Sequence, residues 1–304
     1  MDYKIKVIYS IALLAIFIFL VSSVSADLKD FFLSPSAPTD VSVQVGNAAP
    51  VVNIIVLDNP ITLLSATTVS VNIDFTAEDP NGLPGSNLDD SSVTISFDYP
   101  AGGPYTESRS GGIADCLTSD LGNVRTYDCA MTMQYFDANG LWDVSVSVDD
   151  NAVPPLTGSD SSTTTVNLLR DITLTTGSPI SFGAVAPGQN DITTTPTSVD
   201  NNGNYMGTID VTAQNLEDSV FSDIIPAGNF NTAGSSGAAT VCTAGTTLID
   251  AIVVTITSTN LQKDTIPGEN LGEDISWCLD VPSGIASATY STTEGTSGPW
   301  TIEI

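Results

Sequence analysis

The side chains that could carry chemistry in this chain are almost all oxygen donors. Asp and Glu together number 35, Lys and Arg number 7, and His is absent. Because His is the commonest general base and metal ligand, neither a Ser/His nor a Cys/His triad can be built from this sequence. We therefore expect a protein that is not an enzyme, and its carboxylates are the groups that attract divalent cations.

The net charge of −28 also limits the partners of the chain. Affinity for phosphate comes from Lys and Arg that displace counterions, so we expect neither nucleic acids nor anionic lipid surfaces as partners. The charge divides almost evenly between the two sides of Arg170, so it belongs to the whole chain. The simpler explanation is solubility in a salty exterior, where ions screen self-repulsion.

Alternation of apolar and polar residues with a period of two dominates the sequence after residue 50, and this is typical of half-buried strands. In the first half we expect strands near 51–57, 67–77, 92–98, 104–110, 124–135, 142–149 and 162–169. In the second half we expect them near 172–177, 192–200, 206–213, 249–257, 274–280, 287–293 and 299–304. The sequence therefore predicts an all-β fold of two tandem immunoglobulin-like β-sandwich domains.

The predicted domains occupy residues 51–170 and 171–304. The boundary near Arg170 offers almost no linker, so we expect the two domains to be joined tightly. Residues 214–248 are predicted to form a loop-rich insertion in the second domain.

Short motifs in both halves resemble known sandwich modules. Residues 75–82 (FTAEDPNG) and 135–150 (YFDANGLWDVSVSVDD) resemble the acidic turn and the closing strands of PKD-like and related immunoglobulin-like modules. Residues 181–188 (SFGAVAPG) and 201–204 (NNGN) are similar to sandwich modules of microbial surface proteins. The resemblance implies cell-surface adhesion, spacing or assembly, and it implies no particular ligand.

Seven oxygen-bearing side chains are expected to meet at one end of the first sandwich. With immunoglobulin strand order, the strands near 67–77 and 142–149 run in the same direction and end at one pole. Calcium takes about six to eight oxygen ligands, so this pole is a candidate calcium site. The alternative is that these carboxylates cap turns that face solvent. The seven residues are Glu78, Asp79, Asn81, Asp89, Asp90, Asp149 and Asp150.

Two further motifs give weaker predictions. Asp200, Asn202 and Asn204 have the alternate spacing of a calcium loop, but the glycine stands at 203 and no closing Glu follows at the required distance. The three Trp residues lie in alternating strands, where such side chains are core residues more often than sugar platforms.

The four cysteines indicate export. Cys116 and Cys129 lie in the first half of the chain, and Cys242 and Cys278 lie in the second. An even number of cysteines outside the cell indicates disulfides. Four cysteines allow three pairings, of which one bridge within each half is the simplest. A structural zinc site is not indicated, because the sequence has neither a CxxC pair nor His.

Residues 27–50 are predicted to be an extended spacer with a short strand. Pro35 and Pro38 favour an extended chain, and Val41, Val43 and Val45 alternate with polar residues. This strand either pairs at an edge of the first sandwich or adds to an open sheet edge of a neighbouring subunit. In the second case main-chain hydrogen bonds would supply the affinity.

These features together favour a non-enzymatic extracellular protein of the cell surface that acts by structure or interaction. It would be a filament subunit or a surface-layer-associated subunit, with other surface proteins or copies of itself as partners. The alternative is a carbohydrate-binding or adhesion module assisted by calcium, with glycans as partners.

The first 26 residues have the layout of a secretory signal peptide. Lys4 and Lys6 precede an apolar run over 7–21, and small residues lead up to Ala26. The run is shorter than the roughly 20 residues of a membrane-spanning helix. We therefore expect removal of residues 1–26, which gives a net charge of −29 and leaves no membrane contact; an uncleaved anchor is the alternative.

N-terminal sequencing of the secreted protein tests the cleavage. We expect the first residue to be Asp27, because the small side chains of Ser25 and Ala26 suit a signal peptidase. An intact Met1 would show that the segment is retained as an anchor.

Overall fold

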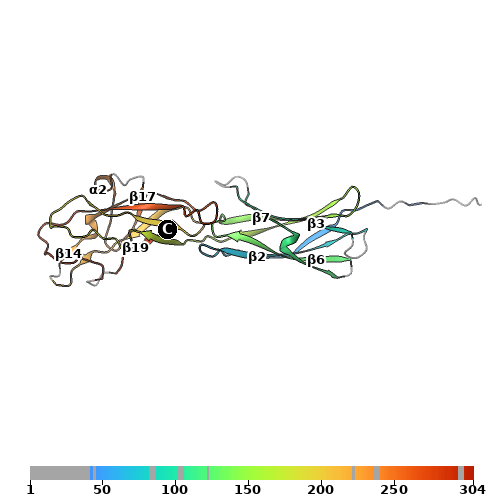
Figure 1. Ribbon diagram of the computed structural model, residues 1–304, viewed down its shortest axis with the longest axis horizontal. Coiled ribbons are helices and arrows are strands. Elements are labelled where there is room, and N and C mark those ends of the chain that lie inside the picture. The colour runs from blue at the N-terminus through green and yellow to red at the C-terminus, as the bar shows by residue number, and fades with distance from the viewer. Residues whose placement is uncertain are drawn as a thin grey trace, which may run out of the picture. The chain divides into compact units, whose positions relative to one another are not determined.

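The computed structural model describes residues 42–43, 46–81, 87–100, 106–121, 123–220, 223–235, 240–293 and 298–304. The structure is almost entirely β, with antiparallel sheets that pack as sandwiches (Figure 1), which confirms the predicted all-β fold class. Contacts divide the chain into two units, residues 1–46 and 47–304, and every strand named below lies in the second unit. Among the described residues, no helix has the length and apolar character needed to cross a membrane.

Two predictions for the N-terminal part fall largely outside this description. The expected signal segment 1–26 lies outside the described residues, and so do Val41 and Val45 of the expected short strand. Ser42 and Val43 are described and belong to no strand.

The first sandwich consists of two four-stranded sheets. One sheet has the order β1-β2-β6-β5, built from β1 (Val51–Leu57), β2 (Thr68–Glu78), β5 (Cys116–Leu121) and β6 (Val124–Gln134). The other has the order β4-β3-β7-β8, built from β3 (Leu88–Asp98), β4 (Ser108–Gly112), β7 (Gly140–Asp150) and β8 (Thr157–Val166). A short helix, η1 (Ile113–Asp115), joins β4 to β5. Both sheets have interior strands from the middle of the unit, β2 and β6 in one and β3 and β7 in the other, with edge strands on either side.

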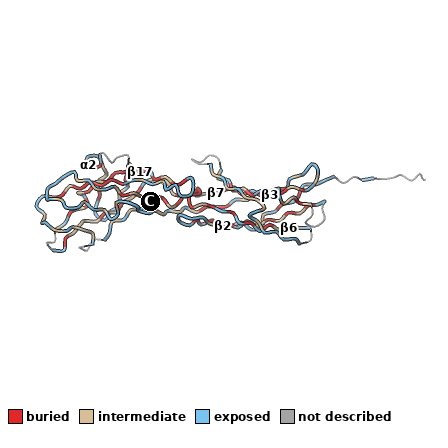
Figure 2. Tube along the Cα trace, in the orientation of Figure 1, coloured by how far each residue is buried: buried red, intermediate tan, exposed pale blue. Residues whose placement is uncertain are grey.

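Alternation along each strand turns one face of each sheet into the core. Phe75 of β2, Phe97 of β3, Tyr127 of β6 and Trp142 of β7 are fully buried, and Figure 2 shows buried positions along the inside of the sandwich. The Phe75 and Tyr127 rings stack with centroids 4.6 Å apart. The indole N–H of Trp142 donates to the Ala138 carbonyl oxygen at 2.8 Å, so its polar atom is satisfied within the core.

The second sandwich has a larger and a smaller sheet. The larger has the order β16-β15-β18-β11-β9, with β10 also paired to β18; its strands are β9 (Ile172–Thr176), β10 (Ile192–Thr193), β11 (Thr197–Asn201), β15 (Phe230–Gly234), β16 (Thr246–Thr247) and β18 (Gly272–Leu279). The smaller has the order β17-β12-β19, from β12 (Gly207–Thr212), β17 (Val253–Leu261) and β19 (Thr301–Glu303). The remaining elements are β13 (Leu216–Glu217), β14 (Ile224–Ile225), η2 (Ala227–Asn229) and α2 (Val241–Ala244).

The buried apolar residues form two main cores, one in each sandwich. The first core is drawn from residues 52–166 and the second from residues 199–281. Leu169 packs against the first core and Ile172 packs against the second. The change from one core to the other therefore takes place within a few residues.

Several strand predictions differ from the structure. The interpretation of residues 214–248 as a loop-rich insertion is wrong for β15, which is an interior strand of the larger sheet, and β17 begins and ends four residues later than the strand predicted at 249–257. The strand expected near 162–169 is β8, which starts earlier and ends at Val166. No strand covers residues 287–293, where Ser291 pairs with Glu217 in an isolated β-bridge. β5 was not predicted, because its large apolar residues lie on its solvent side. Leu117 and Leu121 are 75% and 83% exposed, while Cys116 is bonded to Cys129 of β6.

Both cysteine pairs form disulfides within one half of the chain, which confirms the simplest of the three possible pairings. Cys116 of β5 is bonded to Cys129, its direct partner on β6. Cys242 of α2 is bonded to Cys278 of β18. Each bridge therefore ties a peripheral element to a strand inside a sheet.

A buried lysine joins the two sandwiches. Lys263, two residues after β17, is only 4% exposed. Its ammonium group donates to the Phe136 carbonyl oxygen at 2.7 Å and forms an ion pair with Glu107. Because Phe136 and Glu107 belong to the first sandwich, this one cation holds two of its oxygen acceptors against the second.

Asp264 adds a second buried contact across the same joint. It is 1% exposed and accepts hydrogen bonds from the Tyr135 hydroxyl and, at 2.8 Å, from the Leu271 N–H. Burial, together with the bond to Asp264, raises the pKa of Tyr135 to about 12. The phenol therefore stays protonated as the donor at neutral pH.

The loop between β11 and β12 completes the joint. The Asn204 side-chain amide donates to the Asp137 carbonyl oxygen at 2.9 Å and the Asn167 carbonyl oxygen at 3.1 Å, and its Oδ1 accepts from the Leu169 N–H at 2.6 Å. A Cβ at position 203 would stand 2.2 Å from the Leu169 carbonyl oxygen, so only Gly203 allows this approach.

Replacement of Lys263 by Met tests the joint. We expect Lys263→Met to cost about 3–5 kcal/mol of unfolding free energy, because it leaves the Glu107 carboxylate without its cation. Denaturant unfolding measures the cost, and the double variant Lys263→Met/Glu107→Gln should recover part of it, since the uncompensated charge is gone. Equal stability of Lys263→Met and the wild type would contradict this role.

Candidate functional site

The predicted oxygen donors lie at the end of the first sandwich where β2 and β7 finish. Glu78 is the last residue of β2, and Asp150 is the last residue of β7. Asp89 pairs directly with Asp149 across β3 and β7. We call this end of the sandwich, with all seven predicted residues, the acidic pole.

Two residues that precede β1 bridge the strand ends of the acidic pole. The Asn47 side-chain amide donates to the Asp150 carboxylate, and the Ala48 N–H donates to Asn81 Oδ1 at 2.6 Å. One short segment therefore holds the turn after β2 close to the end of β7. The sequence predicted that these two strand ends lie at the same pole.

Asp150 is a buried carboxylate satisfied by its own loop. It is 2% exposed, and its Oδ1 accepts from the Leu156 N–H at 2.9 Å and the Ala152 N–H at 3.1 Å. Burial alone would raise the pKa of Asp150, but these two bonds and the one from Asn47 outweigh it and lower the pKa below its ordinary value. Asp150 is therefore ionised in the folded protein at neutral pH.

Asp79 and Asp149 also accept hydrogen bonds. Asp79 is 6% exposed and accepts from the Asn81 N–H at 2.8 Å, and Asp149 accepts from the Thr157 hydroxyl at 2.6 Å. The Asp79 bond is the turn contact that the alternative interpretation of the pole predicts, whereas Asp149 bonds its cross-strand partner on β8.

Two of the predicted residues are engaged with first-sandwich partners of their own. Asp90 forms a two-oxygen contact with the Arg125 guanidinium, at 2.6 and 2.8 Å, and accepts from the Tyr127 hydroxyl at 2.8 Å. Burial, together with this bond to Asp90, raises the pKa of Tyr127. Glu78 accepts from the Asn123 side-chain amide. Asp90 therefore neutralises an arginine between the two sheets.

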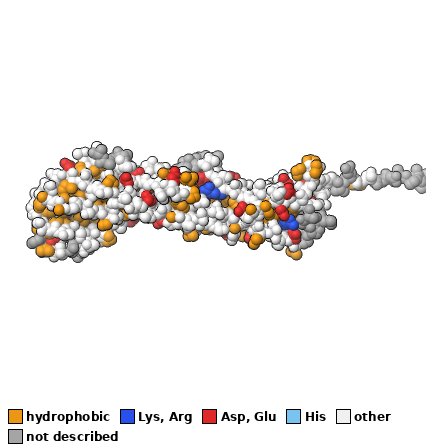
Figure 3. Space-filling view, in the orientation of Figure 1, with side chains coloured by type: hydrophobic (Ala, Val, Ile, Leu, Met, Phe, Trp, Pro, Cys, Tyr) orange, Lys and Arg blue, Asp and Glu red, His pale blue; other side chains and the backbone are white. Residues whose placement is uncertain are grey.

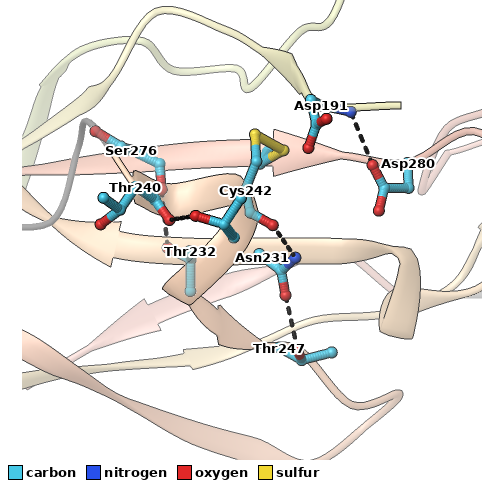
Figure 4. The surroundings of a disulfide bond; sticks show 10 residues. Asp191, Asn231, Thr232, Thr240, Cys242, Thr247, Ser276 and Asp280 are labelled. Carbon is cyan, nitrogen blue, oxygen red and sulfur yellow. Dashed lines mark hydrogen bonds between the residues drawn. A yellow bond between two sulfur atoms is a disulfide. The ribbon is translucent and has the colours of Figure 1, made fainter. Parts of the chain in front are cut away.

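The carboxylates of the acidic pole do not form a group of three. Within the described residues, only Asp191, Cys242 and Cys278 bring three ligand atoms of Asp, Glu, Cys or His within 4.8 Å of one another. The two sulfur atoms of that group form a disulfide, beside which Asp191 lies in Figure 4. Calcium binding by the acidic pole stays a prediction, which calorimetric titration with Ca²⁺ tests.

Two Asn residues of the loop with calcium-loop spacing make structural contacts. Asn204 is 3% exposed and holds the joint, and the Asn202 side-chain amide contacts the Thr173 hydroxyl. Asn201, 1% exposed, donates to the Tyr205 carbonyl oxygen at 2.7 Å and the Gln262 carbonyl oxygen at 3.0 Å. The run of amide side chains therefore satisfies backbone groups where the sandwiches meet.

A pair of carboxylates on the first sandwich was not predicted. Asp74 of β2 stands directly opposite Asp128 of β6. Burial, then the charge of Asp128 and a hydrogen bond with it, raises the pKa of Asp74. This pair exists because of the register between β2 and β6. The sequence alone does not indicate that register, so it could not indicate the pair.

The second sandwich contains a groove between its two sheets. We call it the β9–β19 groove, because Leu174 of β9 and Ile302 of β19 line it, together with Phe182, Phe230, Tyr290 and Trp300. Its volume is about 410 Å³, and none of its described lining residues carries a charge. Hydrophobic side chains also gather over the second sandwich on the face drawn in Figure 3. An uncharged groove is unusual in a chain this acidic.

The aromatic residues of the groove use their polar atoms elsewhere. The Trp300 indole N–H donates to the Gln214 carbonyl oxygen at 2.8 Å, and the Tyr290 hydroxyl donates to the Ala286 carbonyl oxygen at 3.0 Å. The Trp300 ring packs edge-on against Phe230 with centroids 4.9 Å apart. The rings therefore present carbon surfaces to the groove. Trp300 is only partly buried, whereas Trp142 and Trp277 are core residues as expected.

Comparison of the sequence with protein-family models finds no match, and comparison with curated proteins finds no similar sequence. The resemblance to PKD-like and immunoglobulin-like modules accordingly stays a prediction.

Replacement of Asp150 by Asn tests the hydrogen bonding of the acidic pole. We expect Asp150→Asn to cost about 1–3 kcal/mol of unfolding free energy, because the two N–H bonds to Oδ1 lose their charged acceptor and the new side-chain NH₂ would face the Asn47 amide donor. Asp149→Asn is the matched control, since its half-buried carboxylate accepts from a hydroxyl that can reverse its bond.

The cost of Asp150→Asn should depend on pH in one direction. Because folding lowers the pKa of Asp150, its contribution is complete above the ordinary Asp value of about 3.9 and is lost as pH falls through the folded pKa. The stability difference from the wild type should therefore be constant from neutral pH to about pH 4 and should shrink below it. A difference that grows on acidification would contradict this assignment.

Proposed function

We propose that this chain is a non-enzymatic extracellular protein of the cell surface, with a structural or interaction role as an assembling subunit. The observation that carries the proposal is the joint between the sandwiches. Lys263, Asp264 and Asn204 connect them through buried polar contacts with almost no linker between the cores. A joint of this kind keeps two modules in a fixed relation, which suits a spacer or a repeating subunit.

The use of the cations supports the same role. Arg109 pairs with Asp137, Arg125 with Asp90 and Asp120, and Lys263 with Glu107. Arg170 stacks on Tyr205 and donates to the Ile304 carbonyl oxygen. Every Lys and Arg of the described chain is thus engaged within the protein, and on the face drawn in Figure 3 the visible cations lie beside Asp or Glu. Partners rich in phosphate would find little to bind.

The two disulfides fit an oxidising compartment. Each stabilises its sandwich by restricting the unfolded chain, which suits a protein that works outside the cell. The acidic surface would keep such a protein soluble in a salty exterior.

The alternative is a carbohydrate-binding or adhesion module, and the β9–β19 groove is the observation that favours it. Trp300 and Tyr290 offer ring surfaces, and neighbouring Ser and Thr residues such as Ser178 and Thr292 offer hydroxyl groups. A glycan array probed with the secreted protein tests this alternative. Binding that is lost in Trp300→Ala would support it.

Sedimentation of the mature chain tests the proposed assembly. We expect species larger than a monomer, and we expect their proportion to rise from about 0.1 M to about 1 M salt, because the Debye length falls from about 10 Å to about 3 Å and screens the like charges of the copies. A monomer at every concentration and at both salt concentrations would contradict an assembling subunit.

A further inference from the structure

The β9–β19 groove lies on an open side of the second sandwich. β9 stands at one end of the order β16-β15-β18-β11-β9, and β19 stands at one end of β17-β12-β19. Within the described residues, each of the two strands is paired on one side only. The free side of an edge strand presents N–H and C=O groups that can pair with another chain. The groove therefore combines a slot for apolar side chains with unused positions for a strand.

The segment 41–46 has the composition that this groove accepts. Its sequence, Val-Ser-Val-Gln-Val-Gly, carries no charge. In an extended chain Val41, Val43 and Val45 project to one side, and the polar residues project to the other. Val43 is 82% exposed and lies in no strand. Because an unpaired charge is costly in an apolar slot, an uncharged segment of an acidic chain is a suitable occupant.

The segment cannot reach the groove of its own chain. Asn47 bonds Asp150 at the end of β7, whereas Asp137, three residues before β7, contacts the second sandwich through Asn204. The 11 residues of β7 span roughly 36 Å, at about 3.3 Å per residue. Four residues from Asn47 to Val43 reach at most about 14 Å. The groove must therefore receive this segment from another copy.

We infer that residues 41–45 of one copy bind as an added strand in the β9–β19 groove of a second copy. The three valines enter the groove, and the main chain pairs with the free edge of β9 or β19. This inference rests on the proposed function, since it names the partner as a second copy of the chain. The segment and the groove are different surfaces, so the contact repeats head to tail and forms an open chain of subunits.

A disulfide between two copies tests the contact. One preparation of the mature chain carries Val43→Cys and a second carries Leu174→Cys, and the two are mixed in a glutathione redox buffer. We expect a covalent heterodimer on non-reducing electrophoresis, because binding raises the effective concentration of the two thiols. The four native cysteines provide no free thiol that could react with the introduced ones, since all four are in disulfides.

Leu121→Cys in the second preparation is the matched control. Leu121 is also a leucine on an edge strand, and at 83% exposed it is more accessible than Leu174 at 37%. We expect the Leu174→Cys pair to form at least about tenfold faster than the Leu121→Cys pair. Equal rates would overturn the inference, and so would rapid closure of an intrachain disulfide in a chain that carries both Val43→Cys and Leu174→Cys.

A charge added at neighbouring positions gives a second readout. Val43→Asp places a carboxylate in the apolar groove, whereas Ser42→Asp places the same charge on the opposite side of the strand. We expect Val43→Asp to abolish the large species in sedimentation and Ser42→Asp to retain them. Equal effects of the two variants would contradict insertion of the valines.

The outcomes separate this inference from the proposed function. Large species without the Val43–Leu174 crosslink would refute this contact and leave the assembling subunit standing. A monomer with no crosslink would refute both. Glycan binding that Trp300→Ala abolishes, with no crosslink, would assign the groove to a carbohydrate and would also refute the inference.

Discussion

The structure depends on the burial of one ammonium group where the two sandwiches meet. Lys263 is enclosed between Glu107 and the Phe136 carbonyl oxygen, in a chain that has few cations and many carboxylates. A buried ion pair is not stabilising by itself, because desolvation offsets much of the attraction, but it is strongly directional and tolerates only one arrangement. The contacts of Asp264 and Asn204 beside it act in the same way, since each satisfies a buried polar group of the other sandwich. The joint is therefore defined by polar geometry, and the apolar cores lie to either side of it.

Much of the fold could be predicted from the sequence, because alternation reports directly which face of a strand is buried. β2 and β7 carry large apolar residues at every second position, so both were predicted, as was their common end with Asp150 and Glu78. β5 could not be predicted, because all its residues except Cys116 are exposed and its pairing depends on β6. The Lys263–Glu107 contact joins residues 156 positions apart, and no local pattern in the sequence indicates such a pair.

The candidate sites show the same division between local and tertiary information. The acidic pole was predictable because acidic residues follow two strand ends, but the way in which each carboxylate is satisfied depends on N–H groups of neighbouring loops. The β9–β19 groove was not predicted, because Phe230 and Trp300 come from segments 70 residues apart and Phe230 lies in the region interpreted as loops. The absence of charged residues from the groove can be recognised only once the structure shows which residues line it. The lining of the groove and the sequence of residues 41–46 are both uncharged in an acidic chain, and the proposed pairing accounts for both.

Hydrogen exchange of the mature chain, followed residue by residue as protein concentration rises, tests the central claim most directly. Slow exchange reports main-chain hydrogen bonds. An added strand creates such bonds, whereas contact between side-chain surfaces alone does not. The account predicts that the amides of residues 42–45 and those on the free edge of β9 or β19 become protected together as copies associate. Fast exchange of residues 42–45 at every concentration, in samples where large species are present, would contradict it.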